Sequence, residues 1–222
     1  NLTSLPTSNK NTAFGLHALN GATSPANTAV GSNALSSGLS GSGMNTAIGN
    51  GSSVMLANSQ KNVSMGHNSF PNATDDSNLN TVIGVDTFQR ITSDSSQNTC
   101  IGSSIGGNFN NGSYNSFFGS TTNVSDVSST YLYSTALGYG ATIDASYQIV
   151  LGRNTEYVYI PSTTPSTGTS DGALVVGGGA GIGGNLYVAQ NIVSNTLDVS
   201  GSTYINGSFQ TDGNVFLHQE TN

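Results

Sequence analysis

The hydrophobic residues of this chain recur in short clusters that share one order of residue types. A polar residue, usually asparagine, is followed by a Thr-like residue, a small residue, a large apolar residue and glycine. The copies are NTAFG (11–15), NTAVG (27–31), NTAIG (45–49), NVSMG (62–66), NTVIG (80–84), NTCIG (98–102), NSFFG (115–119), STALG (134–138) and QIVLG (148–152). Their closing glycines are 14 to 19 residues apart. Short β-favouring runs closed by glycine predict strands that each end at a corner.

These repeats predict a parallel β-solenoid. A unit of this length cannot bury a core alone, so each repeat must form one coil of a stack that shares a core with its neighbours. Nine copies therefore predict about nine coils. A second, weaker strand per coil is expected from segments such as 15–21, 31–38 and 138–146, and segments 71–78 and 121–130 are expected to be loops of variable length.

The alternation within each copy predicts which residues share a face. In a strand, the Thr-like and large apolar residues lie on one face and the small residue lies on the other. We expect the face with the large apolar residues to point into the core. In the copy at 27–31, Thr28 and Val30 would then be buried and Ala29 would face outward. The recurring asparagine is expected to stack from coil to coil as a hydrogen-bonded ladder.

The pattern changes after residue 152. Residues 161–172, PSTTPSTGTSDG, predict a linker because they are rich in Pro, Ser, Thr and Gly. One chain with few apolar residues per strand cannot close a core beyond this linker, whereas three chains around a common axis can. Trimerisation also removes exposed sheet edges. The short strands expected there are at Leu174/Val176, Leu186/Val188, Leu197/Val199, Tyr204 and Val215/Leu217.

The sequence thus predicts an all-β, homotrimeric protein. A β-solenoid head is expected over residues 1–152, and a neck with the linker over 153–172. A slender triple β-prism or β-helix shaft is expected over 173–222.

Two parts of the chain resemble known families. Thr28, Ala29, Val30 and Gly31, followed by Ala34, are similar to the S-V-A-I-G-x-x-A-x-A-x-G repeat of YadA-like trimeric adhesin heads. This resemblance covers about residues 11–152 and implies a left-handed parallel β-roll, with coils mostly longer than the usual fourteen residues of that family. Residues from about 153 to 222, above all the stretch ending GALVVGGGAGIGGNLYV, resemble the fibre junctions and shafts of phages and large DNA viruses.

Composition excludes several classes of protein. The net charge is −7 with only four basic residues, so the chain lacks the basic surface that nucleic acid requires. Regularly spaced apolar clusters argue against disorder. No apolar stretch approaches the roughly 20 residues that span a bilayer, and we expect neither membrane insertion nor a signal peptide at the start. A single cysteine, Cys100, excludes an intrachain disulfide and is expected to be a buried structural thiol.

Two glycine motifs resemble enzyme signatures. Gly179, Gly181 and Gly184 fit the dinucleotide motif G-x-G-x-x-G, and Asp198 lies 19 residues beyond Gly179. Residues 102–106, GSSIG, fit the nucleophile motif G-x-S-x-G of hydrolases. Both motifs need a following helix, and the residues that follow are rich in β-formers and turns. We therefore expect no enzyme activity, no catalytic residue and no bound cofactor.

Metal and ligand sites have weak support. His17 and His67 are expected at the surface, whereas His218 near a three-fold axis would place three imidazoles together. Asp75 and Asp76 are expected to lie in a solvated loop rather than to hold Ca²⁺. We therefore expect no metal site. Six tyrosines between 131 and 159 predict either a packed neck or, as the alternative, an aromatic platform for a glycan.

These observations predict a structural attachment protein. We expect a trimeric fibre of a virus or phage particle, located on the virion surface or otherwise outside the cell. It would present loops to a host-surface glycan or receptor and contact other virion or fibre components. The residues that bind the receptor are not identified by the sequence. The alternatives are the head of a bacterial trimeric adhesin and an ice-binding solenoid with a threonine ladder at Thr12, Thr28, Thr46, Thr81 and Thr99.

Overall fold

The fold is all-β. The computed structural model describes residues 10–20, 24–37, 41–54, 58–72, 76–91, 94–189 and 191–201. These residues form thirteen short strands and no helix. The chain divides into two compact units, Asn1–Ile160 and Pro161–Asn222, and each is described by itself.

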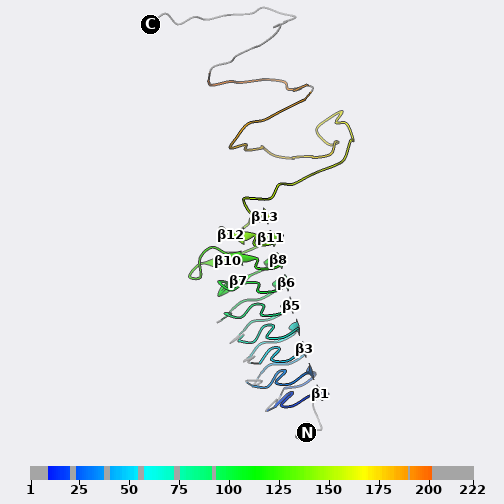
Figure 1. Cartoon of the computed structure of the whole chain (residues 1–222), viewed down its shortest axis with the longest axis vertical. Coiled ribbons are helices and arrows are strands. Elements are labelled where there is room, and N and C mark those ends of the chain that lie inside the picture. Colours follow the sequence, from blue (N-terminus) through cyan, green and yellow to red (C-terminus); the bar gives the residue numbers. More distant parts are fainter. Residues whose placement is uncertain are drawn as a thin grey trace, which may run out of the picture. The chain divides into compact units, whose positions relative to one another are not determined.

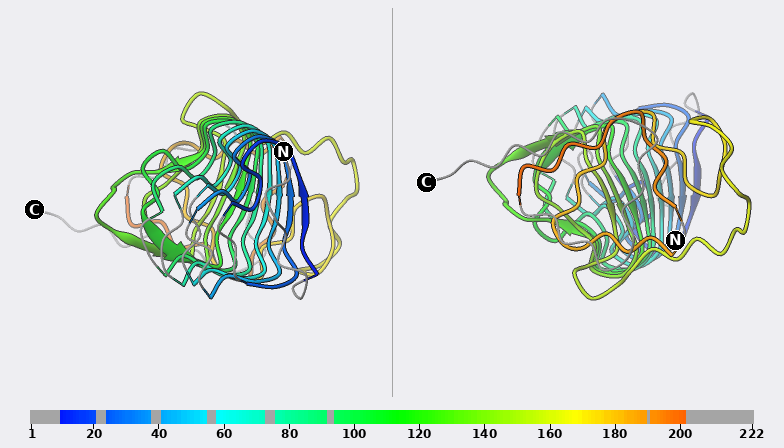
Figure 2. Two further views of the ribbon diagram at one scale, coloured as in Figure 1. Left: turned by 90° about the horizontal axis from the view of Figure 1, so that it is seen from below. Right: turned by 90° about the horizontal axis from the view of Figure 1, so that it is seen from above.

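The first unit is a parallel β-solenoid whose main wall is a nine-stranded sheet (Figure 1). Every repeat copy supplies one strand of this sheet, and like positions pair, as in Thr12 with Thr28 and Ala13 with Ala29. Viewed along the stack, successive coils superimpose (Figure 2). The predicted parallel solenoid is therefore confirmed. The strands are β1 (Thr12–Phe14), β2 (Thr28–Val30), β3 (Thr46–Ile48), β4 (Val63–Met65), β5 (Thr81–Ile83), β6 (Thr99–Ile101), β8 (Ser116–Phe118), β11 (Thr135–Leu137) and β13 (Ile149–Leu151).

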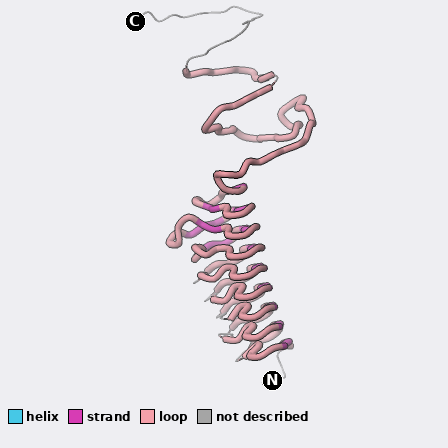
Figure 3. The backbone as a smooth tube through the Cα atoms, viewed as in Figure 1, coloured by secondary structure: helices cyan, strands magenta, loops and turns pink. Residues whose placement is uncertain are grey.

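Two further small parallel sheets occur in the later coils, one formed before and one formed after the main-sheet strand of each coil. Strand β7 (Asn111–Ser113) pairs with β10 (Thr130–Leu132), and β9 (Asn123–Val124) pairs with β12 (Thr142–Ile143). The predicted second strand within 138–146 is thus confirmed as β12. In the early coils this prediction is wrong, because residues 15–20 form turns, and so do most of residues 31–37 (Figure 3).

The chain turns in the early coils because several residues adopt left-handed backbone conformations. Leu19 and Leu35 have φ values of 53° and 47°, and both side chains are buried. A residue in the left-handed conformation bends the chain sharply and ends a strand. At these two corners the leucine side chain therefore enters the core although its backbone belongs to a turn. The same conformation recurs at other corners of the solenoid, including Phe70 and Phe88.

The predicted orientation of the strands is wrong. The small middle residue points into the core, as Ala29, Ala47 and Cys100 show by their complete burial. The Thr-like and large apolar residues point outward, and Ile101 is 41% exposed. The interior of each coil is narrow and is filled from the other walls by large side chains, so the main sheet can contribute mostly small ones. The largest buried aromatic side chains are Phe70, Phe88 and Phe109, together with Phe117, which is the one aromatic middle residue in the main sheet.

The predicted asparagine ladder is confirmed. At its centre, the backbone N–H of Asn80 donates to Asn62 Oδ1 over 2.9 Å, and Asn80 Oδ1 accepts from the backbone N–H of Asn98 over 2.9 Å. Asn80 Nδ2 also donates to the carbonyl of Ser95 over 2.7 Å. Each amide therefore links three neighbouring segments and satisfies buried backbone groups at a corner. The ladder runs through Asn11, Asn27, Asn45, Asn62, Asn80, Asn98 and Asn115.

Replacing Asn80 by alanine should destabilise the solenoid by about 2–4 kcal/mol, because it removes a buried donor and acceptor and leaves the backbone N–H of Asn98 and the carbonyl of Ser95 without this partner. Chemical denaturation followed by circular dichroism measures this change. The matched control is Asn50→Ala, since Asn50 is exposed just after a corner. The control should change stability by less than about 0.5 kcal/mol. Equal effects of the two substitutions would contradict a structural role for the ladder.

Candidate interaction surfaces

The outward face of the nine-stranded sheet is the first candidate surface. We call it the sheet face, and it consists of the first and third residues of the nine strands. No residue of this face is charged. One row contains Thr12, Thr28, Thr46, Val63, Thr81, Thr99, Ser116, Thr135 and Ile149, and the other contains Phe14, Val30, Ile48, Met65, Ile83, Ile101, Phe118, Leu137 and Leu151.

The sheet face is long and largely apolar. Nine strands spaced about 4.8 Å apart give it a length of roughly 40 Å. Leu137 and Leu151 are about half exposed, and Phe14 at the first strand is 73% exposed. A continuous apolar strip of this kind is unusual on a monomer and is typical of an interaction surface.

Three stacked tyrosines form the second candidate surface, which we call the tyrosine ladder. Tyr114, Tyr133 and Tyr147 each occupy the corner residue before a strand of the main sheet. The ring centroids of Tyr114 and Tyr133 are 4.6 Å apart with planes at 10°, and those of Tyr133 and Tyr147 are 5.3 Å apart with planes at 19°. The rings are exposed, Tyr147 most of all at 76%.

The exposure of the tyrosines tests the packed neck, one of the two structures predicted for the tyrosine-rich segment. Of the six tyrosines between residues 131 and 159, Tyr131 is buried and the other five are exposed. A packed neck therefore does not form within a single chain. Tyr139 instead lies under the guanidinium of Arg153, which is 4.8 Å from the ring centroid. Arg153 also pairs with Glu156 at 3.0 Å, and the backbone N–H of Arg153 lowers the pKa of the Glu156 carboxyl.

The second unit is an extended chain with exposed apolar side chains. Its described residues, 161–189 and 191–201, contain no strand, so the strands expected near Leu174, Leu186 and Leu197 do not form within one chain. A lone slender strand has no partner for its backbone groups. Tyr204, Val215 and Leu217 lie outside the described residues. The exposed apolar residues of this unit are Leu174, Val175, Val176, Ile182, Leu186, Tyr187, Val188, Ile192, Val193, Leu197 and Val199.

Comparison with known proteins identifies no relative. No protein-family model, curated protein or solved structure matches the chain.

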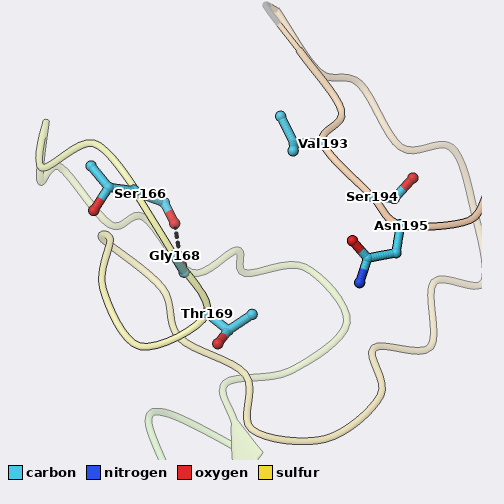
Figure 4. Close-up of a pocket in the computed structure, with 7 residues that line it drawn as sticks. Ser166, Gly168, Thr169, Val193, Ser194 and Asn195 are labelled. Atoms are coloured by element: carbon cyan, nitrogen blue, oxygen red, sulfur yellow. Dashed lines mark hydrogen bonds between the residues drawn. The ribbon is translucent and has the colours of Figure 1, made fainter.

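A depression of about 440 Å³ lies between residues 166–169 and 193–195 of the second unit (Figure 4). Small hydroxyl and amide side chains line it together with Val193, which is 94% exposed. Beside it, Asp171 closes a tight turn. Hydrogen bonds from the Thr167 hydroxyl and from the backbone N–H groups of Gly168 and Thr167 lower the pKa of Asp171 to about 2. These hydrogen bonds stabilise the turn. The depression itself is an open gap between two extended stretches and does not enclose a ligand.

Neither glycine motif forms an enzyme site. Residues 102–106 form a corner of the solenoid, where Ser104 has a φ of 52° and no helix follows. Gly179, Gly181 and Gly184 lie in the extended second unit, and a Cβ at any of them would meet nothing within 4 Å in the single chain. The two motifs therefore lack the strand–turn–helix context that their chemistry needs.

The remaining candidate residues lie apart from one another. Cys100 is buried, as predicted, and burial raises the pKa of its thiol well above the usual value. His17 and His67 are exposed, also as predicted, and His67 Nδ1 is 4.0 Å from Asp86 Oδ1. His218 and Asp75 lie outside the described residues. Within the described residues, no three His, Cys, Asp or Glu side chains gather as metal ligands, and no helix could cross a membrane.

The sequence contained a signal for the tyrosine ladder that its interpretation missed. Tyr114, Tyr133 and Tyr147 precede Asn115, Ser134 and Gln148, which open three successive repeat copies. Residues at one repeat position stack in a solenoid, so this spacing alone predicts three rings in a column.

Proposed function

We propose that this protein is a homotrimeric structural fibre that presents loops for attachment to a host surface, from a virus or phage particle or another extracellular position. It acts without enzyme chemistry or a cofactor. The observation that supports this proposal most is the sheet face, an uncharged, largely apolar strip along the whole solenoid. Water contact with this strip is unfavourable, and a second copy of the chain offers a matching strip with the same repeat.

The second unit supports the same assembly. The large apolar side chains of residues 161–189 and 191–201 are exposed in the single chain, and the backbone of these residues forms no strands. Three copies around a common axis would bury these side chains and pair their backbones as a prism or β-helix shaft. The glycines at 177–179, 181, 183 and 184 would then allow the three backbones to approach closely.

Loops on the side walls are the candidate attachment elements. The segment between β9 and β10 extends from the stack (Figure 1). Within it, Asp126 accepts hydrogen bonds from the backbone N–H of Ser128 and from the hydroxyls of Ser128 and Ser129, which lower its pKa. A loop ordered by its own hydrogen bonds can present a fixed polar surface without using the sheet face.

The mass of the full chain in solution tests this proposal. Light scattering or native mass spectrometry should give three times the chain mass of 22.5 kDa. The trimer should persist at low micromolar concentration, because an interface of this length buries well over about 1,000 Å². A stable monomer at high concentration would overturn the trimer and the fibre function with it.

Ice binding is a second candidate because the threonine row points outward. Thr12, Thr28 and Thr46 are not buried in the core, contrary to the expectation from the sequence, and a flat threonine ladder could face an ice lattice. The neighbouring row mixes Phe, Val, Ile, Met and Leu, and such unequal side chains fit a regular lattice poorly but suit interdigitation with another protein chain. Thermal hysteresis together with a monomeric mass would favour ice binding over the fibre.

A further inference from the structure

We propose that the end of the tyrosine ladder at Tyr147 is a binding site for a neutral pyranose sugar, formed by the Tyr147 ring and by Asp144 and Gln148, whose side chains close the turn that contains Tyr147. This inference rests on the proposed attachment function and names the chemistry of its ligand. It assigns the site to the last coil of the solenoid rather than to the side-wall loops.

Tyr147, at one end of the ladder, is the most exposed of the three rings. Tyr133 stacks between Tyr114 and Tyr147, so both of its faces are covered by neighbouring rings. Tyr147 stacks on one side only and is 76% exposed, compared with 50% for Tyr133. One side of a pyranose ring presents weakly polarised C–H groups, and this apolar side packs well against an exposed aromatic ring.

Tyr147 is held in place before any ligand binds. Its backbone N–H donates to the carbonyl of Leu132 over 2.9 Å. Around it, Gln148 Nε2 donates to Asp144 Oδ1 over 2.7 Å, and the backbone N–H of Asp144 donates to Gln148 Oε1 over 3.1 Å. The Ser146 hydroxyl accepts from the backbone N–H of Leu132 over 3.1 Å. A preorganised platform loses little conformational entropy on binding.

The polar groups that close the turn around Tyr147 match sugar hydroxyls. Within the described part of the chain, the bond between Gln148 and Asp144 leaves Asp144 Oδ2 and the second N–H of Gln148 for a ligand. A carboxylate oxygen accepts from hydroxyl groups and an amide N–H donates to them. Asp144 and the net charge of −7 disfavour sialic acid and other anionic sugars. The site therefore favours a neutral sugar.

The location of the site is compatible with the trimer. Tyr147 lies on the corner two residues before Ile149 of the sheet face, and its side chain belongs to the ladder rather than to the sheet. Assembly of three chains through the sheet face would give three copies of the site per trimer. Weak sites repeated on one particle bind a glycan-covered surface with much higher avidity than a single site does.

Titration of the full chain with methyl glycosides tests this inference. The probes are the methyl glycosides of galactose, glucose, mannose and N-acetylglucosamine, followed by saturation-transfer NMR and by tyrosine fluorescence, which is unobscured because the chain contains no tryptophan. At least one probe should bind with a millimolar Kd. Tyr147→Ala should weaken this binding by at least roughly tenfold, whereas Tyr147→Phe should stay within about threefold, since the ring face makes the contact.

The controls separate this inference from the proposed function. Tyr157→Ala should leave binding unchanged, because Tyr157 is 86% exposed and lies outside the ladder. Absence of binding by all four glycosides, equal binding by Tyr147→Ala, or preferential binding of choline or sialic acid would overturn the sugar site. The mass of the same samples is read in parallel: a trimer that binds no sugar contradicts only this inference, and a monomer that binds sugar contradicts only the fibre.

Discussion

Replacing Gly84 by alanine is expected to unfold the middle of the solenoid under conditions in which the unmodified chain is folded. Gly84 has a φ of +139°, and a Cβ at this position would overlap the carbonyl oxygen of Gly102 in the next coil. Backbone hydrogen bonds hold both corners, from the Gly84 N–H to the Met65 carbonyl and from the Gly102 N–H to the Ile83 carbonyl. We expect a loss of at least about 4 kcal/mol. Thermal melting by circular dichroism and the rate of thiol labelling at the buried Cys100 both measure this loss.

Gly107→Ala is the matched control for Gly84→Ala. Gly107 lies in the same solenoid, and a Cβ there would meet only Asn123 Nδ2 at 3.8 Å, an ordinary contact. The control should melt within a few degrees of the unmodified chain. If Gly84→Ala melts in the same way as the control, the close approach of consecutive corners is incorrect.

Replacing Ile101 by lysine is expected to convert the proposed trimer to monomers while the solenoid stays folded. Ile101 lies in the middle of the sheet face and is 41% exposed in the single chain. A lysine there would be solvated in the monomer but would bring an unpaired charge into each buried interface of the assembly. We expect association to weaken by at least about a thousandfold, which corresponds to roughly 4 kcal/mol. Sedimentation across a concentration series measures it.

Val85→Lys controls for the added charge. Val85 is 47% exposed, close to the value for Ile101, but it follows the corner glycine and lies off the sheet face. This variant should remain trimeric with unchanged melting. Loss of the trimer in both variants would show that the added charge, rather than its position on the sheet face, prevents assembly. If the Ile101→Lys variant remained trimeric, the interface would lie elsewhere.

The sequence specified the strands and their register but not the direction in which they face. Repetition of one residue order predicted that Thr12 pairs with Thr28, and the structure confirms this pairing. An alternation with a period of two identifies Thr28 and Val30 as neighbours on one face, but it does not determine whether that face is buried. The decisive quantity is the space inside the coil, which depends on side chains such as Phe88 and Phe109 from other walls.

The functional surfaces were predictable to different degrees. The tyrosine ladder follows from the repeat positions of Tyr114, Tyr133 and Tyr147 once the solenoid is recognised. The second unit is a different case, because its exposed side chains, including Leu174 and Leu186, have no partner in the chain itself. In the proposed trimer these side chains would be buried by the other two copies, and contacts between copies do not follow from the sequence pattern of one chain.

In the proposed fibre, the stacking of coils would have a mechanical consequence. Strands such as β5 and β6 run across the stack, so a force along the stack acts on the hydrogen bonds of one coil at a time rather than on all of them together. A coil of 14 to 19 residues adds only about 4.8 Å to the folded length but roughly 45–65 Å when pulled straight. Under load the solenoid would lengthen in steps by peeling single coils from an end, and each peeled coil could rewind on the ladder that remains.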